Sequence, residues 1–324
     1  MSKNIISSKV STGGGIKEPC LNSKKIVLSL ATISFLASCA NATLNSEIKT
    51  YDEVHKNTKV RSATDVYNAQ AKIDTTINGS HDDKIETTDQ GPHTIIIQSG
   101  GTLGSIGNTG NIIYASTNNG NTLTLANLTN NGTINGKVAI QNSQDNLTGA
   151  ITVNTFENKG QVNGQIYMGV WGNKNSGILT VDQFNNSGTI TAFDKNQGVF
   201  FEGGANNKST INNFNNTGVI SSTNKEAVQF THTDVKTITN NGNIKSEGHR
   251  GISINNSSVQ TLNNSGTIQT SNQNVNNWDT QAIYIGSSTI QTFINSGTLK
   301  GDGRKDPGGP NGAMFASSGV NLSG

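Results

Sequence analysis

Cysteine is almost missing from this chain, which has two in 324 residues. Cys20 and Cys39 both precede residue 43, so everything after them lacks a thiol for a disulfide or for a zinc site. Stability must then come from a packed core. Charged residues are also few, at 14%. No basic stripe is present, which argues against nucleic acid as a partner.

The usual signatures of catalysis are missing as well. The chain has no Gly-x-Ser-x-Gly elbow, no His-Glu-x-x-His helix and no Walker loop. Its histidines are scattered, and Asp182, Asp194, Glu202 and Glu226 share no repeat offset that would gather them into a carboxylate cluster. We therefore expect no enzyme activity, no cofactor and no metal site.

What the chain has is a repeated frame: an apolar residue, a second apolar residue three positions on, then Asn-x-Gly-x-apolar. The frame occurs eight times. Its glycines are Gly110, Gly132, Gly160, Gly188, Gly218, Gly242, Gly266 and Gly297. Its asparagines are Asn108, Asn130, Asn158, Asn186, Asn216, Asn240, Asn264 and Asn295. The apolar positions are seven and four residues before each glycine and two after it, for example Ile211, Phe214 and Ile220 around Gly218.

The spacing of the frame predicts the fold. Successive glycines lie 22 to 31 residues apart, a period typical of stacked repeats. Apolar and polar residues alternate from four before the glycine to two after it, which indicates a strand with one buried face. The apolar position seven residues before the glycine is out of phase with the one four residues before it, so we expect a bend or bulge between these two positions. The prediction is an all-β, right-handed parallel β-helix with about three short strands per coil and eight or nine coils.

A second apolar run supplies the third strand. It follows seven of the glycines, at Val138–Ile140, Ile166–Met168, Val199–Phe201, Ala227–Phe230, Ile252–Ile254, Ile283–Ile285 and Met314–Phe315. The frame asparagines point inward by phase, so their amides should stack in a structural ladder. The frame glycines should supply positive φ or room for closely spaced coils.

Residues 1–42 have the features of a signal peptide with an extended amino-terminal region. Five lysines precede a twelve-residue apolar run, Ile26–Ala37, which is too short to span a membrane, and Ala40-Asn-Ala42 fits a cleavage site. Cleavage there removes five lysines and one glutamate, so the net charge moves from +2 to −2. The alternative is a lipoprotein, because Leu36-Ala-Ser-Cys39 matches a lipobox and would anchor the chain through Cys39.

The rest of the chain divides into two parts. Residues 43–92 are polar, lack the frame and are expected to form a leader and amino-terminal cap; residues 93–324 form the β-helix repeats, with Ile95–Ile97 at their start. The chain stops within a ninth coil, so we expect a longer natural protein.

The corner after each frame lengthens along the chain. It has three residues after Gly132 and Gly160 and about a dozen at Gln269–Gln281 and Lys300–Gly312. Recognition must use what differs between coils, so these two corners are the candidate binding loops, with Trp278, Asp302, Arg304 and Lys305 as candidate contact residues.

The signal at Lys24–Ala42, the cysteine-free remainder and units such as Asn186-Ser-Gly-Thr-Ile190 together resemble the passenger of a Gram-negative autotransporter, a type V secretion protein. The resemblance implies display at the cell surface or secretion, a carboxy-terminal outer-membrane barrel that this chain does not contain, and a role in adhesion to a host-cell surface or glycan. Two alternatives are a β-helix enzyme acting on polysaccharide and the lipoprotein anchored through Cys39.

Overall fold

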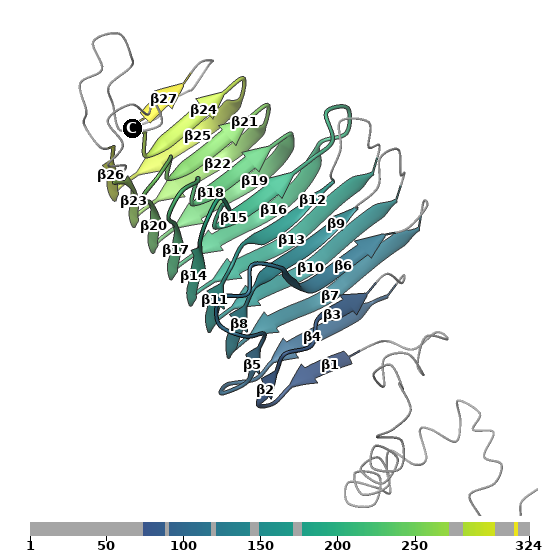
Figure 1. The fold of residues 1–324 in the computed structure, drawn as a ribbon. Helices are drawn as coiled ribbons and strands as arrows, with labels where there is room; N and C mark the ends of the chain where they lie inside the picture. Colours follow the sequence, from purple (N-terminus) through teal and green to yellow (C-terminus); the bar gives the residue numbers. More distant parts are fainter. Residues whose placement is uncertain are drawn as a thin grey trace, which may run out of the picture. The chain divides into compact units, whose positions relative to one another are not determined.

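The computed structural model describes residues 74–87, 91–117, 121–142, 149–170, 177–271, 281–301 and 314–316. They form 27 strands in three parallel sheets of nine strands each (Figure 1). Each coil gives one strand to each sheet in turn, and each strand pairs with its counterparts in the neighbouring coils. The fold is therefore a parallel β-helix, as predicted, with three strands per coil.

The strands of each sheet follow one another through the stack (Figure 1). Sheet A contains β1 (Asp74–Ile77), β4 (His93–Ile97), β7 (Thr122–Asn130), β10 (Ala150–Asn158), β13 (Ile178–Asn186), β16 (Ser209–Asn216), β19 (Thr233–Asn240), β22 (Ser258–Asn264) and β25 (Thr289–Asn295). Sheet B contains β2 (Ser80–His81), β5 (Thr102–Leu103), β8 (Thr133–Asn135), β11 (Gln161–Asn163), β14 (Thr189–Ala192), β17 (Val219–Ser222), β20 (Asn243–Ser246), β23 (Thr267–Thr270) and β26 (Thr298–Lys300). Sheet C contains β3 (Ile85–Thr87), β6 (Asn111–Thr117), β9 (Lys137–Asn142), β12 (Ile166–Val170), β15 (Val199–Glu202), β18 (Val228–Thr231), β21 (Ile252–Asn255), β24 (Ile283–Gly286) and β27 (Met314–Ala316).

The predicted break in phase lies within each long strand of sheet A. In β13, Val181 and Phe184 are both buried, and the two residues between them, Asp182 and Gln183, both face outward. Two successive outward residues allow both halves of the strand to face the core, as a bulge does. The seven second apolar runs form strands of sheet C, also as predicted.

Seven of the eight frames align in register, and the first does not. Leu103 pairs with Ile134 in sheet B, two residues after a glycine, and not with Leu125 of sheet A. The true turn glycine of that coil is Gly101, and Ile106 is 93% exposed. Asn108 lies in a loop, where its side chain accepts a hydrogen bond from the Gly110 amide at 2.8 Å. The assignment of Asn108 to the ladder and Gly110 to the frame is therefore wrong.

The stack also begins earlier than predicted. Strand β1 pairs with β4, β2 with β5 and β3 with β6, so residues 74–87 form a complete coil before Ile95. This coil lies within the predicted leader and cap, and the boundary at residue 93 is wrong for that segment. The sequence frame does not extend to this coil because isoleucine occupies the ladder position: Ile77 pairs with Ile97, which pairs with Asn130.

The other seven frame asparagines form the predicted ladder. Except at the last, Asn295, each side-chain NH₂ donates to the side-chain oxygen of the asparagine in the next coil at 2.7 to 2.8 Å. The donors are Asn130, Asn158, Asn186, Asn216, Asn240 and Asn264. At its start, the Asn130 side-chain oxygen accepts from the Gly132 amide. The buried amides therefore satisfy one another along the stack, which removes the cost of burying them.

Breaking the ladder should destabilise the fold. Replacing Asn216 by Leu leaves the Asn186 donor and the Asn240 acceptor short of a partner, and we expect a loss of about 1–3 kcal/mol in the free energy of unfolding. The exposed Ser187, one residue after a ladder position, is the control, and Ser187→Ala should cost less than about 0.5 kcal/mol. Chemical denaturation measures both, and equal losses would mean that the inward and outward faces are reversed.

The frame glycines provide room for close stacking. None of Gly160, Gly188, Gly218, Gly242, Gly266 and Gly297 has a positive φ. A Cβ atom on any of them would collide with the carbonyl oxygen of the frame glycine one coil earlier. Of the two predicted roles, the close approach of successive coils is the correct one.

Candidate functional site

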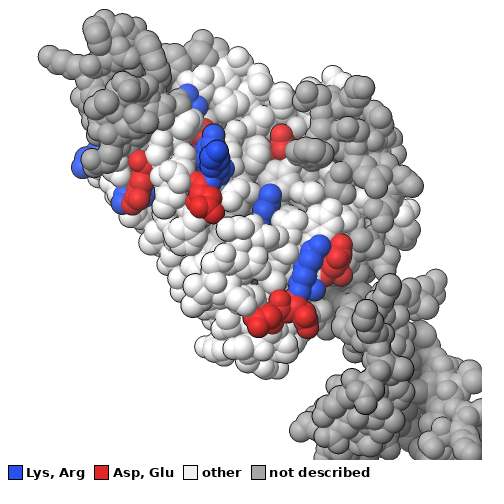
Figure 2. Space-filling view, in the orientation of Figure 1, with Lys and Arg blue, Asp and Glu red and all other residues white. Residues whose placement is uncertain are grey.

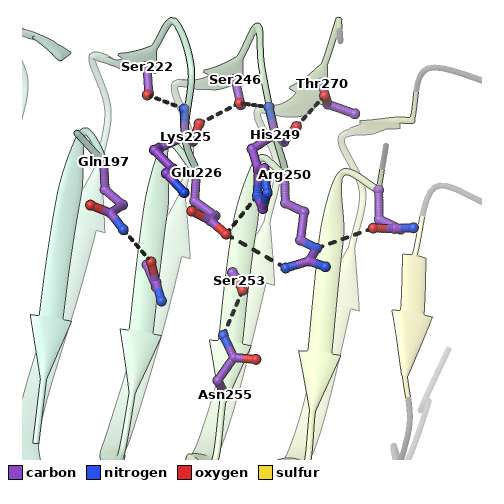
Figure 3. Close-up of polar contacts among 12 residues, drawn as sticks. Gln197, Ser222, Lys225, Glu226, Ser246, His249, Arg250, Ser253, Asn255 and Thr270 are labelled. Carbon is purple, nitrogen blue, oxygen red and sulfur yellow. Dashed lines mark hydrogen bonds and ion pairs between the residues drawn. The ribbon is translucent and has the colours of Figure 1, made fainter. Parts of the chain in front are cut away.

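The corners between sheets B and C carry a repeated hydroxyl. Ser222, Ser246 and Thr270 end successive strands of sheet B, and each donates to a backbone carbonyl in the corner of the coil before. Figure 3 shows these bonds for Ser246 and Thr270. Ser222 and Ser246 also accept from a backbone amide of the corner that follows them, at 3.1 and 2.8 Å. These bonds hold each corner against its neighbours and fix where its side chains point.

A partly buried ion cluster lies on these corners, around the buried carboxylate of Glu226. His249 Nδ1 lies 2.7 Å from Glu226 Oε1, and Arg250 Nη1 lies 3.6 Å from the same oxygen (Figure 3). Arg250 also donates from Nε to Gln281 Oε1 at 3.3 Å and stacks over the Tyr284 ring, with its Cζ 3.8 Å from the ring centre. Gln281 is the last residue of the predicted binding corner Gln269–Gln281, so the cluster anchors one end of that corner.

The cluster keeps Glu226 ionised. Burial alone would raise the pKa of this carboxyl, but the hydrogen bond and charge of His249, a backbone hydrogen bond and the charge of Arg250 together outweigh burial, so the pKa lies below its ordinary value. A buried ion pair of this kind costs desolvation, and removing one member leaves the others unpaired. We interpret the cluster as support for the corner.

The lowered pKa of Glu226 predicts a loss of stability in acid. Below the ordinary pKa of 4.5, the unfolded carboxyl binds a proton before the folded one does, so the free energy of unfolding falls as pH drops through the folded-state pKa. Glu226→Gln should flatten this slope and cost about 1.5–3 kcal/mol at pH 7. The control is Glu247→Gln, because the Glu247 side chain is 51% exposed. This substitution should change neither the slope nor the free energy of unfolding at pH 7. Denaturation at pH 3 to 7 measures both, and a slope that Glu226→Gln leaves unchanged would contradict this account.

The outer face of sheet C carries a recess of about 390 Å³. It spans β6, β9, β12 and β15, which lie side by side in Figure 1. Its lining residues are aromatic, amide-bearing or charged: Asn111, Lys137, Gln141, Gln165, Tyr167, Gln197, Phe200 and Glu202. A volume of this size lies within the range of small-ligand sites.

Contacts between neighbouring coils shape the recess. Tyr167 donates from its hydroxyl to Glu202 Oε2 at 2.7 Å, and its ring lies 5.4 Å from that of Phe200. Lys137 Nζ lies 4.8 Å from the centre of the Tyr167 ring. Residue 169 must be glycine for this arrangement, because a Cβ there would lie 2.6 Å from the Tyr167 hydroxyl.

Burial shifts the ionisation of three of these groups. It raises the pKa of Glu202, and the Tyr167 hydrogen bond and the charges of His232 and Lys137 offset only part of this. It also lowers the pKa of Lys137 and raises the pKa of Tyr167, to which the charge of Glu202 and the hydrogen bond with it add. Such a group of shifted residues in a recess is a common mark of a functional site.

The remaining sequence-predicted residues lie elsewhere. Trp278, Asp302, Arg304 and Lys305 fall outside the described residues. Asp182 accepts a hydrogen bond from Asn212 at 2.7 Å. Asp182 and Glu226 are distant from each other in the sequence. Within the described ranges no group of three histidine, cysteine or acidic residues could hold a metal ion. On the face shown in Figure 2, charged side chains form small groups of mixed sign with wide uncharged areas between them.

Sequence reasoning missed the cluster and the recess, although one signal for the cluster was present. Gln197, Glu226, Arg250 and Gln281 each lie two residues before a strand of sheet C, in successive coils. Opposite charges at equivalent positions of adjacent coils predict an ion pair.

Comparison with known protein families, with curated proteins and with solved structures found no match. Among the described residues, no helix is long and apolar enough to cross a membrane. The class of protein is therefore assigned from the fold, which is a parallel β-helix.

Proposed function

We propose that this chain is the passenger of an autotransporter-like protein, displayed at the cell surface or secreted, and that it acts in adhesion to a host-cell surface or glycan. The repeated frame residues build the core and the ladder in the coils from Gly132 to Gly297, so they are not available for recognition. The outer face of sheet C differs from coil to coil. The observation that carries the proposal is the recess there, which combines aromatic rings with amide side chains.

The location is tested on intact cells of the producing organism. An antibody against the β-helix should stain intact cells or detect the protein in the medium. Detection only after the cells are broken would contradict surface display or secretion.

The role in adhesion needs a separate experiment. Cells that lack the gene should attach to host-cell monolayers less than the parent does, and the restored gene should recover attachment. Equal attachment of both strains would contradict the proposed role.

A second candidate is an enzyme acting on polysaccharide, which is favoured by the shifted pKa values of Glu202, Lys137 and Tyr167 in one recess. The raised pKa of Glu202 suits a general acid. Incubation with polysaccharides and analysis of chain length separates the candidates. Shortened chains that disappear with Glu202→Gln would support the enzyme, and intact polysaccharide would support binding alone.

A further inference from the structure

We infer that the recess on sheet C binds a neutral oligosaccharide, which lies across β9, β12 and β15 along the axis of the stack. This inference rests on the proposed adhesive function and names the chemistry of its ligand. Three features of the recess support it: its length, its hydrogen-bonding groups and its balance of charge.

The length suits a chain ligand. The recess crosses four consecutive coils, and adjacent strands lie about 4.8 Å apart, so it extends over about 14 Å. One coil spacing is close to the advance of one hexose unit along a polysaccharide. Successive sugars would therefore meet equivalent positions in successive coils.

Amide side chains supply hydrogen bonds of the kind that hydroxyl groups need. Gln165 donates to Gln197 at 2.8 Å, and Gln197 donates to Gln229 at 2.7 Å. A primary amide has two donors and two acceptor sites. These two hydrogen bonds use one donor and one acceptor site of Gln197, so one donor and one acceptor site remain for a ligand. A sugar hydroxyl both donates and accepts, and such a pair of groups matches it.

Aromatic rings supply the apolar part of the surface. Phe200 is half-buried, and its ring is tilted by 53° to that of Tyr167. A pyranose ring presents C–H groups on its faces, which pack against an aromatic face and bury apolar area. The hydroxyls at the edge of the sugar then remain free to reach the neighbouring amides.

The balance of charge favours a neutral ligand. One ammonium, Lys137, and one carboxylate, Glu202, line the recess, and Lys137 already lies against the Tyr167 ring. A site for phosphate, sulfate or a uronic acid gathers several cationic or N–H donors without a facing carboxylate. With one cation facing one carboxyl group, the recess has no surplus of cationic donors for an acidic sugar, and a neutral sugar needs none.

The matched variants come from the register of sheet C. Tyr114, Tyr167, Phe200 and Gln229 occupy the same register position in different coils, so glutamine is compatible with this position. Phe200→Gln removes an aromatic ring of the recess. Tyr114→Gln removes an aromatic ring at the same register outside the recess and serves as the control.

The experiment is calorimetry or ligand-observed NMR with neutral tetrasaccharides of glucose, galactose, mannose and N-acetylglucosamine, and with tetragalacturonate as the acidic probe. We expect binding of at least one neutral probe, weakened about tenfold by Phe200→Gln and unchanged by Tyr114→Gln. An unchanged unfolding midpoint shows that each variant is folded. Binding of tetragalacturonate alone, binding that Phe200→Gln leaves unchanged, or no binding of any neutral probe would overturn the inference.

Failure here is distinguishable from failure of the proposed function. Phe200→Gln cells that keep full attachment would refute the recess as the binding site and leave the adhesive role in place. Loss of surface display, or equal attachment with and without the gene, would refute the proposed function itself.

Discussion

Phe214→Ala should lower the free energy of unfolding by about 3–5 kcal/mol, the largest loss expected for a single truncation in the core. The Phe214 ring stacks on Phe184 at 5.0 Å and meets Phe201 and Phe230 edge-on at 6.1 and 5.6 Å. It is 1% exposed. Truncation opens a cavity between sheets A and C that the hydrogen-bonded coils cannot close. Denaturation with urea measures the loss.

Two further variants make this prediction specific. Phe193 is 47% exposed at a corner, and Phe193→Ala should change stability by less than about 0.5 kcal/mol. Phe214→Leu should cost less than about 1.5 kcal/mol, because Ile238 and Leu262 occupy the same register in the next two coils. Similar losses for Phe214→Ala and Phe193→Ala would contradict the described core.

Gly218→Ala should have the second large effect, a loss of about 1–3 kcal/mol or more from overpacking against backbone. The added Cβ would collide with the Gly188 carbonyl oxygen, and a backbone atom in a stacked coil cannot move aside as a side chain can. The Gly218 amide also donates to the Asn186 carbonyl at 3.1 Å, so a displaced turn loses this bond as well. The unfolding midpoint in urea measures the effect.

Gly110→Ala is the matched comparison, because Gly110 fits the same sequence frame. A Cβ there meets only the Asn108 side-chain oxygen, at 3.3 Å, and the expected change is within about 0.5 kcal/mol. Equal losses of stability for Gly218→Ala and Gly110→Ala would mean that Gly110 is a frame glycine. That result would contradict the register described for the first coils.

The frame predicted the fold well because each of its positions has one structural role, which repeats in the coils from Gly132 to Gly297. Alternation sets the buried face, the asparagines must bond to one another, and the glycines must admit the next coil. The Gly110 unit met every position of the frame by coincidence. It alone lacked a second apolar run, because Ile112 and Ile113 belong to the sheet C strand β6 itself. That missing third strand was the available evidence against it.

The candidate site was harder to predict because outer-face residues follow no repeat. The recess depends on a tyrosine, a glutamate and a glycine from neighbouring strands, Tyr167, Gly169 and Glu202, which are unrelated in the sequence. Only the register of sheet C brings them together: Gly169 pairs with Glu202, and Tyr167 with Phe200. The corner cluster at Glu226 was easier to predict from the sequence, because Arg250 occupies the equivalent position one coil later. Trp278 and the other predicted loop residues stay predictions.

The parallel register of neighbouring coils is the claim on which the rest depends, and a cross-link tests it most directly. Asn215 pairs with Thr239 in the next coil, and Thr239 pairs with Asn263 in the one after. In a chain with Cys20 and Cys39 replaced by serine, Asn215→Cys with Thr239→Cys should form a disulfide on oxidation, because adjacent strands lie about 4.8 Å apart and a disulfide spans about 4.4–6.8 Å. Asn215→Cys with Asn263→Cys should remain reduced, at a separation of about 9.6 Å by the same spacing. A cross-link in the second pair and none in the first would contradict the stacked coils.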